Sequence, residues 1–174
     1  MKLEQGLVQV YTGNGKGKTT ASLGLALRAI GRGLKVYVIQ FMKGCEYGEI
    51  LALKSNPNLK IVQFGRESFV SKEKAAEIDI SLAKRGLEHA KEIVMSGKYD
   101  LAILDEINVA LDYKLINLED VLELIAKKPR HVELVLTGRY APKEIIKAAD
   151  LVTEMLDIKH PFEKGLLARK GIDY

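Results

Sequence analysis

The sequence predicts an α/β fold, a single doubly wound and mostly parallel sheet with helices on both faces. Strand-like runs alternate with helix-like runs along the whole chain, which is the order that βαβ units produce. Some strand-like runs are nearly or wholly apolar, as at residues 36–41 and 101–104, and such strands are buried on both faces of a parallel sheet. At 174 residues the chain suits one domain, residues 1–174, and no repeat, linker or low-complexity tract divides it.

The expected strands are short runs rich in β-branched residues and bounded by glycine, proline or charged residues. They lie at residues 7–11, 36–41, 61–64, 101–104, 132–137 and 151–155.

The expected helices lie at residues 18–32, 48–54, 72–96, 118–127 and 142–149. In the longest of them, apolar positions such as Ile78, Leu82 and Ala90 keep helical spacing, and Gly97 ends the run. Asn117 is placed to cap the helix at 118–127, which Pro129 closes.

A glycine-rich turn joins the first strand to the first helix and predicts a phosphate-binding loop. Glycines let the backbone curl around an anion, and the start of a helix adds partial positive charge. Lys18 would neutralise phosphate oxygens, and the Thr19 hydroxyl would complete a magnesium shell. The residues predicted to hold the phosphates are Gly13, Asn14, Gly15, Lys16, Gly17, Lys18, Thr19 and Thr20.

This loop is one residue shorter than the common form, in which four residues separate the first glycine from Gly-Lys-Ser/Thr. Thr12 stands where that glycine belongs, and only three residues separate Gly13 from Gly17. A shorter loop must hold a triphosphate differently, so the loop leaves room for nucleotide chemistry other than γ-phosphate hydrolysis.

Acidic residues end the strand at 101–104, where ligands gather in open parallel sheets. Asp105 is placed to meet magnesium directly or through water, and Glu106 to bind the metal or polarise water. The simpler alternative is an acidic cap for a following helix.

Few other side chains offer chemistry. Arg139, after another strand, could neutralise phosphate or hold loops together through carboxylates. His89 and His131 are expected to be surface or packing residues, and Cys45 a spare loop thiol.

Composition argues against a nucleic-acid or membrane partner. The net charge of +4 is mild, and the lysines are spread among acidic residues. Nucleic-acid platforms have a concentrated basic stripe or interleaved aromatic residues, and neither is visible here. No apolar run is long enough to span a bilayer, so we expect a cytoplasmic protein.

Five motifs in order give the chain a close resemblance to the ATP:corrinoid adenosyltransferases of cobalamin synthesis and salvage. They are residues 13–21, 38–44, 104–106, 136–139 and the tail from Lys159–Phe162 to Gly171–Tyr174.

The resemblance implies a homodimeric, RecA-like P-loop enzyme that transfers the 5′-deoxyadenosyl group of ATP to reduced cobalt and releases triphosphate. It implies ATP as co-substrate, Mg²⁺, a corrinoid substrate and a flavoprotein reductant, with ATP reversed relative to other P-loop enzymes. Lys18, Thr19 and Glu106 would act in catalysis, and Thr19, Glu106 and Asp105 would hold the metal. The tail, about residues 157–174, would complete the site.

The family places apolar or aromatic side chains near the corrinoid, where they help to exclude the lower axial ligand of cobalt. The matching stretch is residues 64–70, but this chain has no tryptophan, which family members carry there. Phe69 would take its place beside Val70, and ordinary loop packing is the alternative role for Phe69.

Two other functions use part of the same pattern. A P-loop ATPase or kinase acting on a nucleoside or nucleic acid needs only Lys18, Thr19 and the acidic pair. A nucleotide-gated binding module needs no turnover at all.

Overall fold

The computed structural model describes residues 3–68, 70–72 and 75–173. Six parallel strands form one sheet in the order β3-β2-β4-β5-β1-β6. From β1 the chain crosses to β2 and β3 at one edge of the sheet, and it then returns through β4 and β5 to β6 at the other edge. This reversal of strand order is typical of a doubly wound α/β fold. The strands are β1 (Val8–Thr12), β2 (Val36–Phe41), β3 (Leu59–Phe64), β4 (Leu101–Asp105), β5 (Glu133–Thr137) and β6 (Leu151–Glu154).

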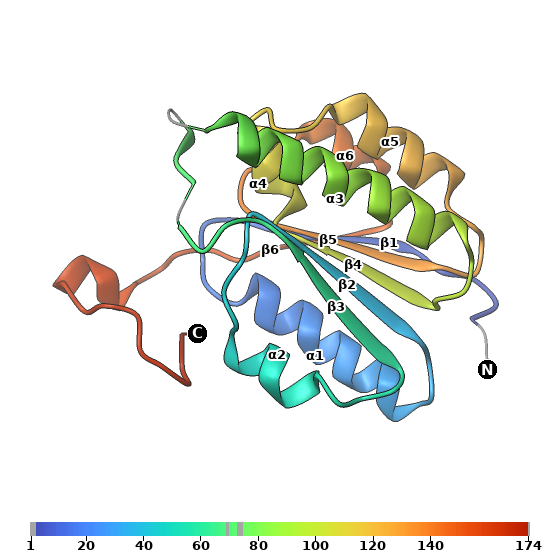
Figure 1. Cartoon of the computed structure of the whole chain (residues 1–174), viewed down its shortest axis with the longest axis horizontal. Helices are drawn as coiled ribbons and strands as arrows, with labels where there is room; N and C mark the ends of the chain where they lie inside the picture. Colours follow the sequence, from blue (N-terminus) through green and yellow to red (C-terminus); the bar gives the residue numbers. More distant parts are fainter. Residues whose placement is uncertain (1–2, 69, 73–74, 174) are drawn as a thin grey trace.

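Helices cover both faces of the sheet, as predicted (Figure 1). One face carries α1 (Lys18–Gly31) and α2 (Gly48–Leu53). The other carries α3 (Glu77–Met95), α4 (Ile107–Asp112), α5 (Leu118–Lys127) and α6 (Lys143–Ala148). A 3-10 helix, η2 (Pro161–Lys164), lies in the C-terminal tail.

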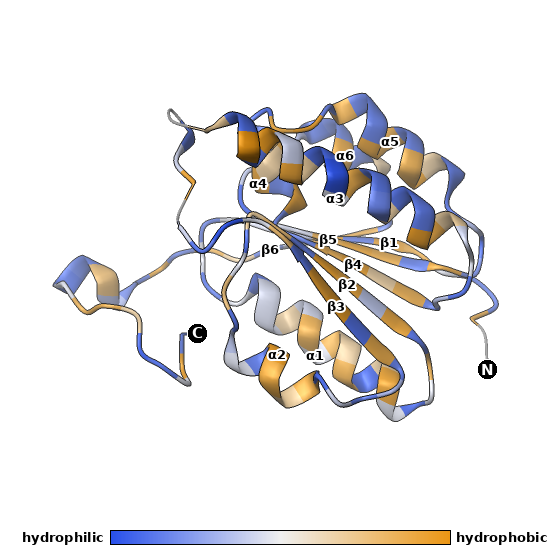
Figure 2. Cartoon of the chain, in the orientation of Figure 1, coloured by the Kyte–Doolittle hydropathy of each residue, from blue (hydrophilic) through white to orange (hydrophobic). Residues whose placement is uncertain are grey.

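The core consists of two apolar layers, one on each side of the sheet. Every residue of β2 and β4 is buried, which confirms the prediction made from their apolar sequences. Figure 2 shows many hydrophobic residues along the strands and largely hydrophilic outer faces on α3 and α5, whereas α2 shows hydrophobic residues. The edge strand β6 is different, since all four of its residues are exposed.

The predicted helix at 72–96 is too long at its start, because α3 begins at Glu77. Asp79 explains the later start. Its carboxylate accepts the backbone N–H of Ala76 at 2.9 Å and both guanidinium N–H groups of Arg66 at 2.7 Å, which fixes a cap there. Ile78, one of the apolar positions that keep helical spacing, is 48% exposed.

A short helix was missed, α4, which begins directly after Glu106. Its six residues are too few to show a helical period, so the sequence pattern gives no sign of it.

The carboxyl ends of the strands lie at one edge of the sheet. The segment after β6 contacts the loop after β1 at this edge. After β6 the tail runs outward beyond that edge (Figure 1). Among the described residues no helix is both long enough and apolar enough to cross a membrane.

Candidate functional site

The loop of residues 13–17 links β1 to α1, which confirms the predicted strand, glycine-rich turn and helix. Gly13 and Gly17 have φ angles of 92° and 119°, in the left-handed region that side chains with a Cβ avoid. The glycines at these two positions are therefore required by the backbone of the turn itself.

The chain after β6 packs directly against this loop. Gly15 donates its backbone N–H to the Met155 carbonyl at 2.7 Å. A Cβ on Gly13 would lie 2.4 Å from the Met155 carbonyl oxygen, and one on Gly15 would lie 2.5 Å from that of Leu156. The small residues thus allow a close approach by the C-terminal segment, a role that the motif alone does not reveal.

Lys18 points back into the loop. Its ammonium donates to the carbonyl oxygens of Gly13, at 2.8 Å, and Gly15, at 2.7 Å, and the residue is only 7% exposed. Burial lowers the pKa of Lys18, and the nearby Glu106 opposes that effect. The loop therefore surrounds a cation where phosphate oxygens are expected.

Asp105 forms the centre of a hydrogen-bond network beneath the loop. The hydroxyls of Thr19 and Thr137 donate to its Oδ1 at 2.9 and 2.7 Å, and Gln40 donates to Oδ2 at 3.0 Å. Lys43 donates to Oδ2 at 2.8 Å and completes the set. Burial alone would raise the pKa of Asp105, but Lys43 and the two hydroxyls hold it below the usual range.

Lys43 contacts two predicted metal ligands at once. Besides its bond to Asp105, its Nζ lies 3.1 Å from Thr19 Oγ1 and 5.4 Å from the centre of the Tyr47 ring. Burial alone would lower the pKa of Lys43, but the charges of Asp105 and Glu106 raise it. This side chain is therefore held as a cation in the middle of the site.

Glu106 follows Asp105 in a left-handed conformation, with φ 63°. Its N–H donates to the Thr137 hydroxyl at 3.0 Å, and the residue lies at the N-cap position of α4, although its side chain makes no capping hydrogen bond there. Burial and the charge of Asp105 raise the pKa of the Glu106 carboxyl.

The side chains around Asp105 fit a magnesium ion. A hydroxyl oxygen and a carboxylate oxygen lie within hydrogen-bond distance of each other, and Mg²⁺ prefers such hard oxygen ligands. The described residues contain no group of three or more His, Cys, Asp or Glu side chains suited to a metal.

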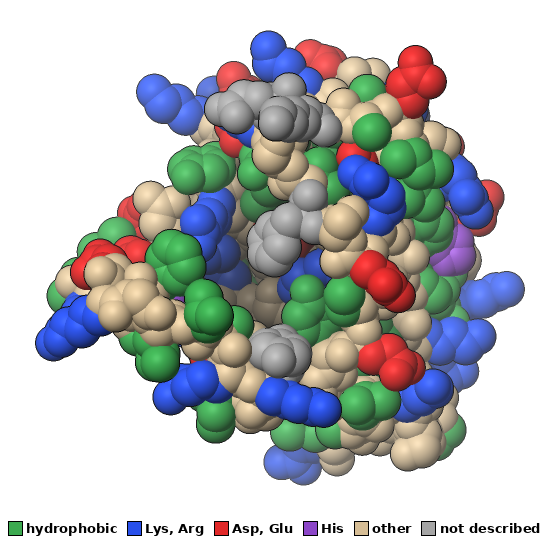
Figure 3. Space-filling view, turned by 60° about the vertical axis from the view of Figure 1, so that its left-hand side comes forward, with side chains coloured by type: hydrophobic (Ala, Val, Ile, Leu, Met, Phe, Trp, Pro, Cys, Tyr) green, Lys and Arg blue, Asp and Glu red, His purple; other side chains and the backbone are tan. Residues whose placement is uncertain are grey.

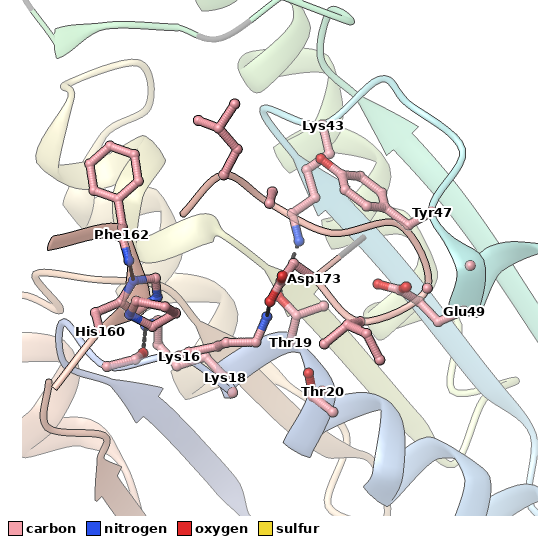
Figure 4. A pocket seen from close by; sticks show the side chains of 18 of the residues that line it. Lys16, Lys18, Thr19, Thr20, Lys43, Tyr47, Glu49, His160, Phe162 and Asp173 are labelled. Atoms are coloured by element: carbon pink, nitrogen blue, oxygen red, sulfur yellow. Dashed lines mark hydrogen bonds and ion pairs between the residues drawn. The ribbon is translucent and has the colours of Figure 1, made fainter. Parts of the chain in front are cut away.

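A cavity of about 450 Å³ opens above the loop. Its lining includes Gly15–Thr20, Lys43, Glu106 and Arg139 on one side and, on the other, nine residues of the tail between positions 160 and 173. Figure 4 shows the tail crossing the cavity, with Asp173 ion-paired to Lys16 and Lys43 reaching toward Thr19.

A second cavity, of about 310 Å³, adjoins the first and shares Lys43, Tyr47, Glu106 and Arg139 with it. Its other walls combine the apolar side chains of Met42, Val70, Val109 and Tyr113 with the polar ones of Arg66, Glu67 and Ser68. Val70 is thus next to this cavity, as the resemblance implies, whereas Phe69 lies outside the described residues. Cys45 also lines the second cavity.

The remaining predicted residues have different positions. Asn14 is exposed and, like Gly13, does not line the first cavity. Arg139 is exposed and faces both cavities; in the part of the chain that the structure describes, no carboxylate forms an ion pair with it. This arrangement leaves its guanidinium available for an anionic ligand.

His89 and His131 have the expected packing roles. His89 lies 2.7 Å from the Tyr37 hydroxyl, and a ring nitrogen of His131 lies 3.0 Å from the Gly97 carbonyl. His160 caps η2 by accepting the Phe162 N–H and also lines the first cavity.

Gln40, Lys43 and Thr137 had no individual role in the sequence analysis, although the motifs at 38–44 and 136–139 contain them. Each lies at or just beyond the carboxyl end of a strand, where ligands bind in open α/β sheets. Their separate contacts with Asp105 could not be read from the motifs.

The fold and this site define a P-loop nucleotide-binding protein. Comparison with known proteins narrows the class. The profile of the family "ATP:corrinoid adenosyltransferase BtuR/CobO/CobP" matches residues 4–174. The chain belongs to this family.

Individual relatives agree over nearly the full chain. A corrinoid adenosyltransferase from Sinorhizobium sp. is 38% identical over 98% of this chain and 81% of its own length. The corrinoid adenosyltransferase of Escherichia coli K12 is 37% identical, and CobA of Salmonella typhimurium LT2 is 36% identical, each over 98% of this chain and 87% of its own length.

Proposed function

We propose that this protein transfers the 5′-deoxyadenosyl group of ATP to the reduced cobalt of a corrinoid, cob(I)alamin or cobinamide, and releases triphosphate. The observation that carries the proposal is the pair of adjoining cavities. One contains the shortened phosphate loop and its lysines, and the other, which shares a wall with it, combines apolar side chains with charged ones. A polyanion and a large apolar ring system would meet at the shared residues.

The bond changes balance without a nucleophile or base from the protein. The electron pair of Co(I) attacks C5′ of ATP, the Co–C bond forms, and the C5′–O bond breaks with its electrons leaving on triphosphate. Cobalt becomes formally Co(III). The protein must align the two reactants and neutralise the leaving group, and the site contains no serine-histidine or cysteine-histidine pair among its described lining residues.

The residues of the first cavity supply that neutralisation. Lys18 and Lys16 would contact phosphate oxygens, with Thr20 at the start of α1 and Arg139 at the wall shared with the second cavity. Thr19 and Asp105, with Glu106 beside them, would hold Mg²⁺. The ion, when bound, would add positive charge to the triphosphate as it leaves.

The second cavity is proposed to receive the corrinoid. Its apolar side chains suit the face of a macrocycle and would disfavour a polar axial ligand on cobalt. Arg66, which lines this cavity, is held by an ion pair with the buried Asp79.

A homodimer, a flavoprotein reductant and a cytoplasmic location complete the proposal. Support for the dimer comes from the apolar side chains of β6 and the tail, where Ile158 is 85% exposed, Leu167 76% and Phe162 68%. Hydrophobic side chains gather on the projecting tail, beside the hollow of the site (Figure 3). ATP as co-substrate and the reduced corrinoid both fit the cytoplasm.

The test is incubation with ATP, Mg²⁺ and chemically reduced cobalamin, followed by the cobalt absorption spectrum and the phosphate products. One triphosphate for each Co–C bond is expected. Orthophosphate without a Co–C bond would indicate the ATPase or kinase instead, and bound ATP without any product would indicate a binding module.

A further inference from the structure

Lys43 occupies the position at which a metal ion would meet its protein ligands. Its Nζ lies 2.8 Å from Asp105 Oδ2 and 3.1 Å from Thr19 Oγ1. These are the two side chains that fit Mg²⁺ by the chemistry of their oxygens. Figure 4 shows the lysine reaching across the cavity toward Thr19. An ammonium between the two oxygens excludes a second cation from them.

The backbone that carries Lys43 is fixed. Met42, just before it, has φ 58° and donates its N–H to the Phe64 carbonyl at 2.9 Å. A Cβ on Gly65 would lie only 2.2 Å from the backbone nitrogen of Lys43, so the segments around Lys43 and Gly65 are in close contact. We therefore expect the ammonium to move by rotation of its four-carbon side chain and not by a shift of the backbone.

Charge balance requires some cation beside Asp105. The carboxylate is 1% exposed, and a buried carboxylate without a counter-charge is strongly destabilising. A metal ion that displaced Lys43 would take over that role. The freed ammonium would then face the cavity that Lys43 itself lines together with Lys18, where phosphate oxygens would accept its hydrogen bonds.

We propose that Lys43 is a place-holding cation. It occupies the metal position between Thr19 and Asp105 when nucleotide is absent, and it turns onto a phosphate oxygen when Mg²⁺ and ATP bind. The metal then enters together with the nucleotide rather than ahead of it. The inference rests on the proposed ATP site, but it involves no corrinoid.

The test measures Mn²⁺ affinity by electron paramagnetic resonance in the nucleotide-free full-length protein. Lys43→Met removes the competing ammonium and should bind Mn²⁺ about tenfold to a hundredfold more tightly than wild type, the range that a charged hydrogen bond implies. Lys84→Met is the matched control. It removes an exposed lysine of α3, outside both cavities, and should leave Mn²⁺ affinity unchanged.

A second titration, with ATP present and corrinoid omitted, should give the opposite sign. There Lys43→Met should bind ATP with Mn²⁺ more weakly than wild type, because a phosphate contact is lost. A purely structural role for Lys43 predicts weaker binding in both titrations. Equal or weaker Mn²⁺ binding by folded Lys43→Met without nucleotide would overturn the proposal.

A crystal structure of the wild-type protein with ATP and Mg²⁺ gives an answer even where Lys43→Met does not fold. The Nζ of Lys43 should donate to a phosphate oxygen and lie beyond hydrogen-bond distance of Asp105. A lysine still bonded to Asp105 in that complex would refute the exchange. None of these measurements depends on adenosyl transfer. Failure of the proposed reaction would therefore be distinguishable from failure of the proposed exchange at Lys43.

Discussion

At the scale of single residues, the site is a set of positive charges gathered around a loop that carries no negative charge of its own. Lys18 bonds to loop carbonyls and Lys43 to a buried carboxylate. Both ammonium groups are thus held near the positions that a bound triphosphate and its metal would occupy. Because these positive charges are already in place, the site needs little reorganisation when negative charge develops on the leaving triphosphate.

Replacing Lys18 with alanine tests the most direct of these roles. Lys18→Ala should lower turnover by about a hundredfold or more, as does the loss of one preorganised contact to developing charge. The fold should survive, because the ammonium bonds only to the loop. Adenosylation rates and circular-dichroism melting curves measure the two effects. Lys84→Ala, on the exposed face of α3, is the control, and an active Lys18→Ala would refute the assigned role.

Alanine substitutions at two glycines, Gly13 in the loop and Gly24 in α1, should have opposite effects. Gly13→Ala combines a φ of 92° with a carbonyl oxygen 2.4 Å from the new Cβ, so it should abolish ATP binding. Gly24→Ala meets nothing within 4 Å in α1 and should stabilise the protein by about 0.5–1 kcal/mol. Calorimetric ATP titration and urea unfolding distinguish them. Normal ATP affinity in Gly13→Ala would contradict the described loop.

At the scale of elements, the first turn of α3 connects the core to the second cavity. Asp79 is 4% exposed, accepts the Ala76 N–H, and holds Arg66 at the edge of that cavity. The helix start and the cavity wall therefore share one carboxylate. This arrangement places the acidic residue where it also favours the helix N-terminus.

The Asp79 pair predicts a specific pH dependence of stability. The hydrogen bond from Arg66 lowers the pKa of Asp79, although burial opposes it. A carboxyl whose folded pKa is depressed stabilises the protein above its unfolded pKa of about 4, and that stability is lost as pH falls through the folded pKa. Asp79→Asn should therefore be less stable than wild type at pH 7, with a gap that narrows below pH 4.

Urea unfolding at pH 7, 5 and 3 measures this gap. Glu77→Gln, in the same helical turn but exposed, is the control and should show little difference at any pH. A gap of constant size down to pH 3 would show that the Asp79 charge contributes nothing.

At the scale of the whole molecule, the C-terminal part of the chain returns to the loop that follows β1. β1 and β6 pair in parallel, the segment after β6 supports the phosphate loop, and the tail then crosses the cavity to pair Asp173 with Lys16. The tail leaves large apolar side chains exposed as it does so. Exposed apolar surface of this kind is typical of association sites.

The proposed homodimer can be tested through the most exposed of these side chains. Ile158→Glu should shift the protein from dimer to monomer in light scattering after size-exclusion chromatography, because a charge at an apolar interface is costly to desolvate. Lys84→Glu, an equal or larger change of charge on α3, should leave the dimer intact. A dimer unaffected by Ile158→Glu would place the interface elsewhere.

Local patterns predicted much of this architecture. The parallel sheet, the glycine loop and the acidic end of β4 follow from runs of adjacent residues, and the structure confirms their arrangement. The contacts of Lys43 with Asp105 and of Lys16 with Asp173 join residues 62 and 157 positions apart. No periodicity or spacing contains such information. The start of α3 was misplaced for a similar reason, because its cap depends on Arg66 from a preceding loop.

The claim that matters most is that the sugar end of ATP, and not its γ-phosphate, is where bonds change. ATP labelled with ¹⁸O at the oxygen bridging C5′ and the α-phosphate tests it when supplied with Mg²⁺ and reduced cobalamin. Attack at C5′ predicts that mass spectrometry finds the label in intact triphosphate, in equal amount to the Co–C bonds formed. Label retained on the nucleoside, or recovery of orthophosphate and ADP, would contradict the account.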